Sequence, residues 1–226
     1  MIVLLNIIIS KNYISGTIDK TLFVKRDEGN IFVVDDIIFG STCELKVKEF
    51  LDIMSSEFEM SMVGELNYFL GLQVKQKDDG MFITQSKYAK HLVKKFGLEN
   101  AKFYNTPMST TLKISKDESE ISVDYKLYKS MIGSLLYLTT SHPDLCYSVG
   151  VYARLQVDPK ESYLQVVKQI IRYVNGTLDY GLWYSMDTTT DLVGYSDANW
   201  AGTIHERKST SGGCFYLGNN LVSWFG

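Results

Sequence analysis

The chain has 226 residues, a formal net charge of −3, and a composition that is 45% hydrophobic and 13% aromatic. This composition excludes intrinsic disorder, because aromatic and β-branched side chains suffice to build a packed core. Only 3 Pro and 17 Gly exclude a collagen-like or linker-type sequence. The acidic balance argues against a general nucleic-acid coat, which is usually strongly basic, but it leaves room for a local basic stripe.

The first ten residues are apolar, but a membrane-spanning helix needs roughly 20 such residues. A secretory leader would carry a basic start and a small-residue cleavage site, and neither pattern is present. The three cysteines include no Cys-x-x-Cys pair, which suits reduced thiols in an intracellular protein. We therefore expect a soluble protein without a membrane partner, in the cytoplasm or alternatively in the nucleus, with Cys43, Cys146 and Cys214 as small core residues.

The first third of the chain is β-rich. Two apolar β-branched runs flank Asp35 and Asp36, which predicts a β-hairpin with the two acids at its tip and with strands buried on both faces or nearly so. Apolar residues at helical spacing predict an amphipathic helix from Glu44 to Phe58. A second hairpin is expected around the turn Asp78-Asp79-Gly80.

The rest of the chain is helical first and then β-rich again. Ser86 is a good N-cap for a helix that runs to about Phe96 and stops at Gly97. The last 50 residues contain four strand-like pieces, and we expect no helix to cover the final three. Strands and helices thus follow one another in blocks along the chain, and the predicted fold class is α+β. Three further helices are expected at Tyr125–Thr140, His142–Leu155 and Glu161–Asn175.

Asp35 and Asp36 are the sharpest chemical feature. A carboxylate between apolar strands needs a partner or a metal ion, or else its pKa rises until it is neutral. Oxygen ligands of this kind suit Mg²⁺ or Mn²⁺. The alternative is an acidic turn that faces water, since Asp is common in turns.

Asp197 and a lysine stripe are the other candidates. Asp197 follows the end of an apolar strand, where it is a metal ligand or an ordinary turn residue. Lys87, Lys90 and Lys94 have i, i+3, i+7 spacing and therefore share one helix face, with Lys95 beside them. Such a face could follow a phosphate backbone, and the alternative is a solvated helix surface.

A series of longer segments follows one another along the chain: VVDDIIFGST, EFEMSMVGELNYFLGLQV, GMFITQSKYAKHLVKKFGLENAK, NTPM, YKSMIGSLLYLTTSHPDLCYSVGVYAR, PKESYLQVVKQIIRYVNGT and GYSDANWAG…RKSTSGGCFYLGNNLVSW. In this order, and from about residue 12 onward, the chain resembles the Pol polyprotein of copia-type LTR retrotransposons. The ordered series is more specific than any single piece, and it favours the functional interpretation of the acids.

The resemblance implies a division into a partial reverse transcriptase palm with its primer-grip hairpin (1–85), a helical thumb and connection (86–176), and an incomplete ribonuclease H-like sheet (177–226). It implies that Asp35 and Asp36 are polymerase aspartates and that Asp197 is the first ribonuclease H carboxylate, all three as ligands of Mg²⁺ or Mn²⁺. It makes Lys87, Lys90, Lys94 and Lys95 nucleic-acid contacts. The implied partners are an RNA template with a DNA primer, or an RNA–DNA hybrid.

The sequence also departs from the family pattern. Val33 stands where the family motif has Tyr, and the first palm motif and the later ribonuclease H acids have no counterpart in these 226 residues. We therefore expect weak metal binding and no catalysis by this chain alone, although the resemblance implies descent from an RNA-directed DNA polymerase. The alternatives are a non-catalytic remnant that binds nucleic acid weakly and, if the family match is a coincidence, an unrelated acidic metal-binding protein.

Overall fold

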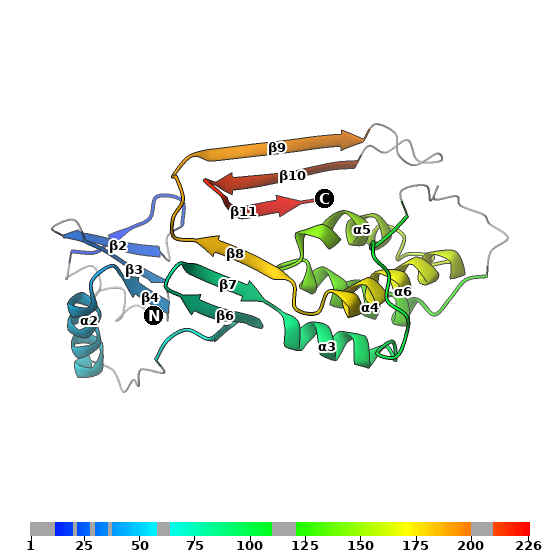
Figure 1. The fold of residues 1–226 in the computed structure, drawn as a ribbon, viewed down its shortest axis with the longest axis horizontal. Helices are drawn as coiled ribbons and strands as arrows, with labels where there is room; N and C mark the ends of the chain where they lie inside the picture. Colours follow the sequence, from blue (N-terminus) through cyan, green and yellow to red (C-terminus); the bar gives the residue numbers. More distant parts are fainter. Residues whose placement is uncertain are drawn as a thin grey trace. The chain divides into compact units, whose positions relative to one another are not determined.

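The computed structural model describes residues 12–19, 22–27, 30–35, 38–57, 64–109, 121–199 and 210–226. Contacts divide the chain into two units, Met1–Glu65 and Leu66–Gly226, and each is described here by itself (Figure 1). The described part contains antiparallel sheets and five helices. This confirms the predicted mixture of helices and antiparallel strands, whereas the palm, thumb and ribonuclease H labels stay predictions.

The N-terminal unit is a four-stranded antiparallel sheet with strands in chain order. The predicted hairpin is confirmed, because the third and fourth strands pair with Asp35 opposite Ile38. The strands are β1 (Ile14–Ser15), β2 (Leu22–Asp27), β3 (Asn30–Asp35) and β4 (Ile38–Ser41).

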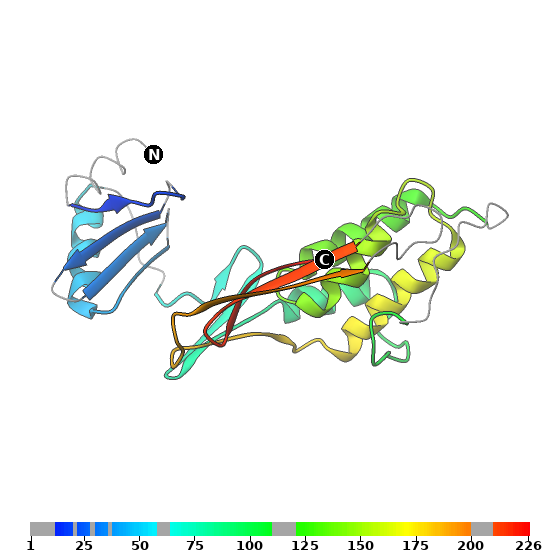
Figure 2. The same cartoon turned by 90° about the horizontal axis from the view of Figure 1, so that it is seen from above.

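One face of this sheet is packed against helix α2 (Glu44–Glu57), as Figure 2 shows. Phe23 and Val34 lie opposite each other in the register, and both are buried with Phe50 of α2. On the other face the neighbouring Val33 is half-buried, so the burial expected on both faces is complete only on the face toward α2. Successive side chains point to opposite faces, and the helix covers one of them.

The C-terminal unit contains two further sheets. The first joins a local hairpin to a strand that follows almost 100 residues later, with Ile83 opposite Leu182. Its strands are β5 (Tyr68–Phe69), β6 (Leu72–Lys77), β7 (Gly80–Thr84) and β8 (Gly181–Ser185), and those of the second sheet are β9 (Leu192–Asn199), β10 (Thr210–Leu217) and β11 (Asn220–Phe225). The division at residues 85 and 176 stays a prediction.

Four helices build the main core of this unit. The predicted helices are confirmed within a few residues, and their apolar stripes meet in one cluster that includes Leu92, Leu135, Val149 and Ile170. Inside it the Tyr128 hydroxyl donates to the Tyr152 carbonyl at 2.9 Å. The helices are α3 (Ser86–Lys95), α4 (Tyr125–Leu138), α5 (Pro143–Ala153) and α6 (Glu161–Gly176).

The C-terminal sheet contacts these helices, contrary to expectation. The indole N–H of Trp224 in β11 donates to the Thr139 carbonyl, just after α4, at 3.0 Å. A Cβ built on Gly226 would meet the backbone of Tyr147 in α5 at 3.1 Å. The end of β11 is therefore held against the helical block, because its indole and terminal glycine find partners there.

Two other predictions concern cysteines and membranes. Cys43, Cys146 and Cys214 are free thiols, but they are half-buried and not core residues. Among the helices of the described ranges, none has the length and apolar character required to cross a membrane.

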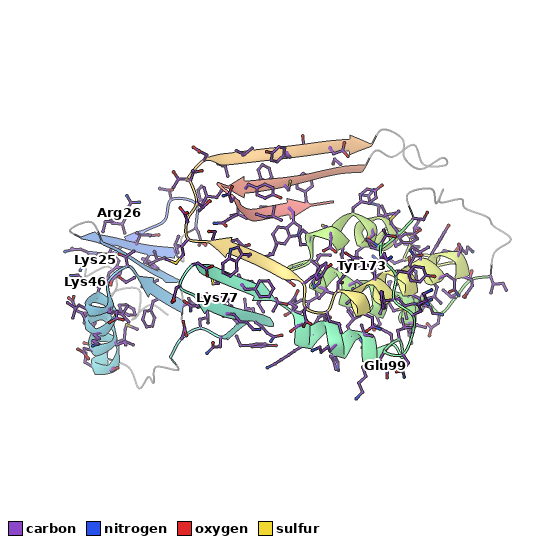
Figure 3. All side chains as sticks on the ribbon, in the orientation of Figure 1. Lys25, Arg26, Lys46, Lys77, Glu99 and Tyr173 are labelled. Carbon is purple, nitrogen blue, oxygen red and sulfur yellow. The ribbon has the colours of Figure 1, made fainter. Side chains whose placement is uncertain are left out.

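His142 occupies an unusual position at the start of α5. Its side chain is buried, with a residue exposure of 1%, and neither ring nitrogen forms a hydrogen bond with a described residue. The nearest carboxylate oxygen, Oδ1 of Asp144, lies 3.8 Å from Nδ1, while Oδ2 of Asp144 accepts a hydrogen bond from Tyr173 at 2.7 Å (Figure 3 labels Tyr173). Burial lowers the pKa of His142 from its ordinary 6.5, and the charge of Asp144 opposes this only in part.

This lowered pKa predicts a pH-dependent stability. In the folded chain His142 resists protonation, whereas in the unfolded chain it takes up a proton near its ordinary pKa. The free energy of unfolding should therefore fall as the pH drops from about 7 to about 5.5. Urea denaturation followed by circular dichroism at each pH measures this slope. In the variant His142→Gln, the free energy of unfolding should depend less steeply on pH over the same range. If the dependence is as steep as in the wild type, titratable groups other than His142 cause it.

Candidate nucleic-acid interface

Helix α3 has one apolar face and one basic face. Ala89, Leu92 and Val93 are buried in the helical core. The opposite face is exposed, and the structure therefore brings all four predicted lysines to one side of a helix whose other side is fixed. Its exposed residues are Lys87, Lys90, His91, Lys94 and Lys95.

The N-terminus of α3 is capped from a neighbouring strand. Ser86 is already helical, so the prediction that it is the N-cap is off by one residue, and Gln85 in that position makes no capping bond. Instead, Oε1 of Gln73 in β6 accepts from the backbone N–H of Lys87 at 2.8 Å and from the hydroxyl of Ser86 at 2.9 Å. These bonds satisfy a donor that the helix cannot pair internally. Gln73 thus fixes the first lysine of the basic face, and the sequence analysis missed it.

Helix α3 ends at Lys95, and the predicted stop residue, Gly97, follows two residues later with a φ of +67°. This left-handed conformation lets the N–H of Leu98 donate to the Val93 carbonyl at 3.0 Å. Lys94 and Lys95 occupy the last turn, where positive charge complements the helix dipole.

The four lysines differ in their surroundings. The ammonium of Lys95 donates to the Ser130 hydroxyl of α4 at 3.1 Å, and that of Lys87 lies 5.8 Å from the ring centre of Tyr68. Among the residues that the structure describes, neither Lys90 nor Lys94 forms an ion pair. These two ammonium groups are therefore the most available for an external anion.

The turn before β6 is fixed to α4. Leu70 and Gly71 have φ values of +47° and +82°, and the Tyr137 hydroxyl of α4 donates to the Leu70 carbonyl at 2.6 Å. A Cβ on Gly71 would collide with that hydroxyl, so glycine is required there for both conformation and space. The hairpin and α3 are thus held by the same helix.

The predicted acids lie elsewhere. Asp35 ends β3 in the N-terminal unit, opposite Leu22 and Ile38, and Asp36 lies outside the described residues. Asp197 belongs to the C-terminal unit, where it is exposed in β9 opposite Gly212. In the ranges covered by the structure, no group of three or more His, Cys, Asp or Glu side chains could hold a metal ion.

Comparisons with known proteins identify the family. Residues 2–110 match the model of the reverse transcriptase (RNA-dependent DNA polymerase) family. The chain is 32% identical to the uncharacterized mitochondrial protein AtMg00810 of Arabidopsis thaliana, over 86% of this chain and 80% of that protein. It is 32% identical to the retrovirus-related Pol polyprotein from transposon RE1 of the same plant, over 97% of this chain, and 29% identical to that from transposon TNT 1-94 of Nicotiana tabacum, over 95%. No solved structure matches.

These matches define a reverse transcriptase-related class of protein. More specifically, the chain belongs to the family of copia-type retrotransposon Pol polyproteins, which confirms the resemblance. It spans only 15% of the RE1 polyprotein and 17% of the TNT 1-94 polyprotein. The activity and substrates of those whole polyproteins are therefore not transferred to it directly.

Loss of the Gln73 cap should loosen the start of α3. The variant Gln73→Ala leaves the N–H of Lys87 without its acceptor, which should cost about 1 kcal/mol of stability. Urea denaturation measures this cost. The control is Gln76→Ala, an exposed glutamine on the same strand with no capping role. Equal effects of the two substitutions would contradict the capping role.

Proposed function

We propose that this chain is a nucleic-acid-binding segment of a retrotransposon reverse transcriptase and that the basic face of α3 contacts the backbone of a template–primer duplex or RNA–DNA hybrid. The observation that carries the proposal is the lysine face itself: four cationic side chains on the outer side of a helix whose inner side is buried. Its membership of a reverse transcriptase family supplies the class of ligand.

The geometry of the stripe supports a backbone contact. Lys87 and Lys94 are seven residues apart, which corresponds to about 10 Å along a helix that rises about 1.5 Å per residue. That length covers about three phosphates of one strand, spaced about 3.4 Å along the duplex axis. Because α3 is capped and packed against the core, binding does not have to order the helix that carries the lysines, and this lowers the entropy cost of binding.

The acids belong to the same proposal. Asp35 is the last residue of β3 and Asp36 follows it in the sequence, and as adjacent oxygen donors they fit Mg²⁺ or Mn²⁺. Such ions would supply charge stabilisation for phosphoryl transfer. Asp197, exposed in β9, is proposed as a ribonuclease H carboxylate. The intracellular location also stays a prediction.

Taken alone, the 226-residue polypeptide is proposed to be inactive at both sites. The segments that carry the family resemblance include two polymerase aspartates and one ribonuclease H aspartate, and an Mg²⁺ ion held by so few carboxylates keeps most of its waters. The second candidate function, favoured by the exposed lysines, is that of a non-catalytic remnant of the polyprotein that binds nucleic acid only weakly and has no part in reverse transcription.

The binding proposal predicts an effect of charge removal on α3. The double variant Lys90→Gln, Lys94→Gln should weaken binding to an RNA–DNA hybrid and reduce the slope of log K against log salt by roughly two, because two phosphate contacts are lost. Fluorescence anisotropy across a salt series measures both quantities. The control Lys48→Gln, Lys102→Gln changes the same charge at two exposed positions that do not belong to α3 and should leave the slope unchanged. Equal slopes for the two double variants would contradict the proposal.

The catalytic proposal predicts no polymerase activity from the isolated chain. In a primer-extension assay with Mg²⁺ or Mn²⁺, the wild type should incorporate no more nucleotide than Asp35→Asn, because the carboxylates present do not complete a two-metal site. Template-dependent incorporation above that control would overturn the inactivity and would support catalysis through Asp35.

A further inference from the structure

Strand pairing gathers aromatic and basic side chains on one face of the β5–β8 sheet. Lys75, Phe82 and Trp183 lie directly opposite one another across β6, β7 and β8. Lys77 is two residues beyond Lys75 on the same strand, and Tyr68 of β5 lies opposite Gln73, two residues before it. Because side chains alternate between faces, all of them point to the same side.

This aromatic–lysine face, defined by Tyr68, Lys75, Lys77, Phe82 and Trp183, is the exposed one. Tyr68 and Trp183 are 54% and 39% exposed, and both lysines are exposed. The opposite face carries Val74 and Leu182, which are only 5% and 8% exposed. The sheet therefore buries its aliphatic side and shows its rings to solvent.

Glycines make room for two of the rings. A Cβ on Gly80 would lie 2.6 Å from the Trp183 ring, and one on Gly181 would lie 2.9 Å from the Phe82 ring. Each ring therefore rests over the backbone of the neighbouring strand. This packing fixes both rings before any ligand arrives.

The lysines of this face carry positive charges that can bind an external anion. The ammonium of Lys77, labelled in Figure 3, lies 5.5 Å from the ring centre of Trp183, and that of Lys87 lies 5.8 Å from Tyr68. No described residue forms an ion pair with Lys75, Lys77 or Lys87. Asp78 and Asp79, in the β6–β7 turn, place negative charge at one end of the face.

We infer that the aromatic–lysine face binds a single-stranded segment of nucleic acid. Unpaired bases would stack on Tyr68 and Trp183. The phosphates of the same strand would form ion pairs with the lysine ammonium groups that lie near these rings. Paired bases cannot offer their faces to a ring, so the occupant is single-stranded, unlike the duplex proposed for α3. The inference extends the proposed function to a second surface of the same unit, and each surface has its own test.

Fluorescence anisotropy with the full chain and labelled oligothymidylate or oligouridylate of about ten nucleotides tests the inference. Trp183→Ala and Tyr68→Ala should each lower the affinity about tenfold, in keeping with the loss of one stacked base. Trp183→Phe keeps a ring and should retain most of the affinity. Tyr195→Ala removes a tyrosine of β9 that is more exposed than Tyr68 and should leave the affinity unchanged. Comparison of the two oligonucleotides distinguishes DNA from RNA as the preferred strand.

Circular dichroism confirms that each variant is folded. Single-strand affinity that is equal in Trp183→Ala, Tyr68→Ala and wild type would overturn the inference, as would the absence of single-strand binding by the wild type. If hybrid binding still depends on Lys90 and Lys94 in that case, the proposed function stands without this surface. If only the single strand binds, and does so through the rings, the α3 proposal fails and this inference holds.

Discussion

The pairing of β7 with β8 is the constraint on which the C-terminal unit depends. It joins segments almost 100 residues apart, and the Thr84 hydroxyl adds a bond to the Tyr180 carbonyl at 2.8 Å. Helices α4, α5 and α6 all lie between these strands in the sequence. Closing so long a loop costs conformational entropy, which the helical core offsets by burying apolar surface. The same pairing places Trp183 beside Phe82 and so creates the aromatic–lysine face.

Polar side chains connect the sheet to the helices at a few defined points. Gln73 caps α3, while the buried Gln85 donates to the Tyr137 carbonyl at 3.3 Å and accepts from the Ser141 hydroxyl at 2.8 Å. Tyr137 in turn holds the Leu70 carbonyl. Buried polar groups are stable only with partners, so these bonds favour one orientation of α3 relative to the hairpin. The basic face and the aromatic–lysine face are thereby fixed on the same unit.

The candidate polymerase acids illustrate how far sequence patterns reach. The apolar runs around Asp35 predicted a hairpin, and the register of β3 with β4 confirms it. The pattern could not tell which face of those strands would be covered, because that depends on where α2 packs. It also could not test the metal roles of Asp35, Asp36 and Asp197, since ligation requires several groups from separate segments to converge.

By itself, the sequence determined the local elements and the family. Helical periodicity, Gly97, the Asp-Gly turn and the lysine spacing of α3 are all signals within a few residues, so they can be recognised without a fold. Only the tertiary structure decided that Gln73 caps α3, that His142 is buried with neither ring nitrogen hydrogen-bonded to a described residue, and that Tyr68 and Trp183 share a face. These features join residues that are distant in the chain, and their contacts arise from packing and strand register, which no local pattern records.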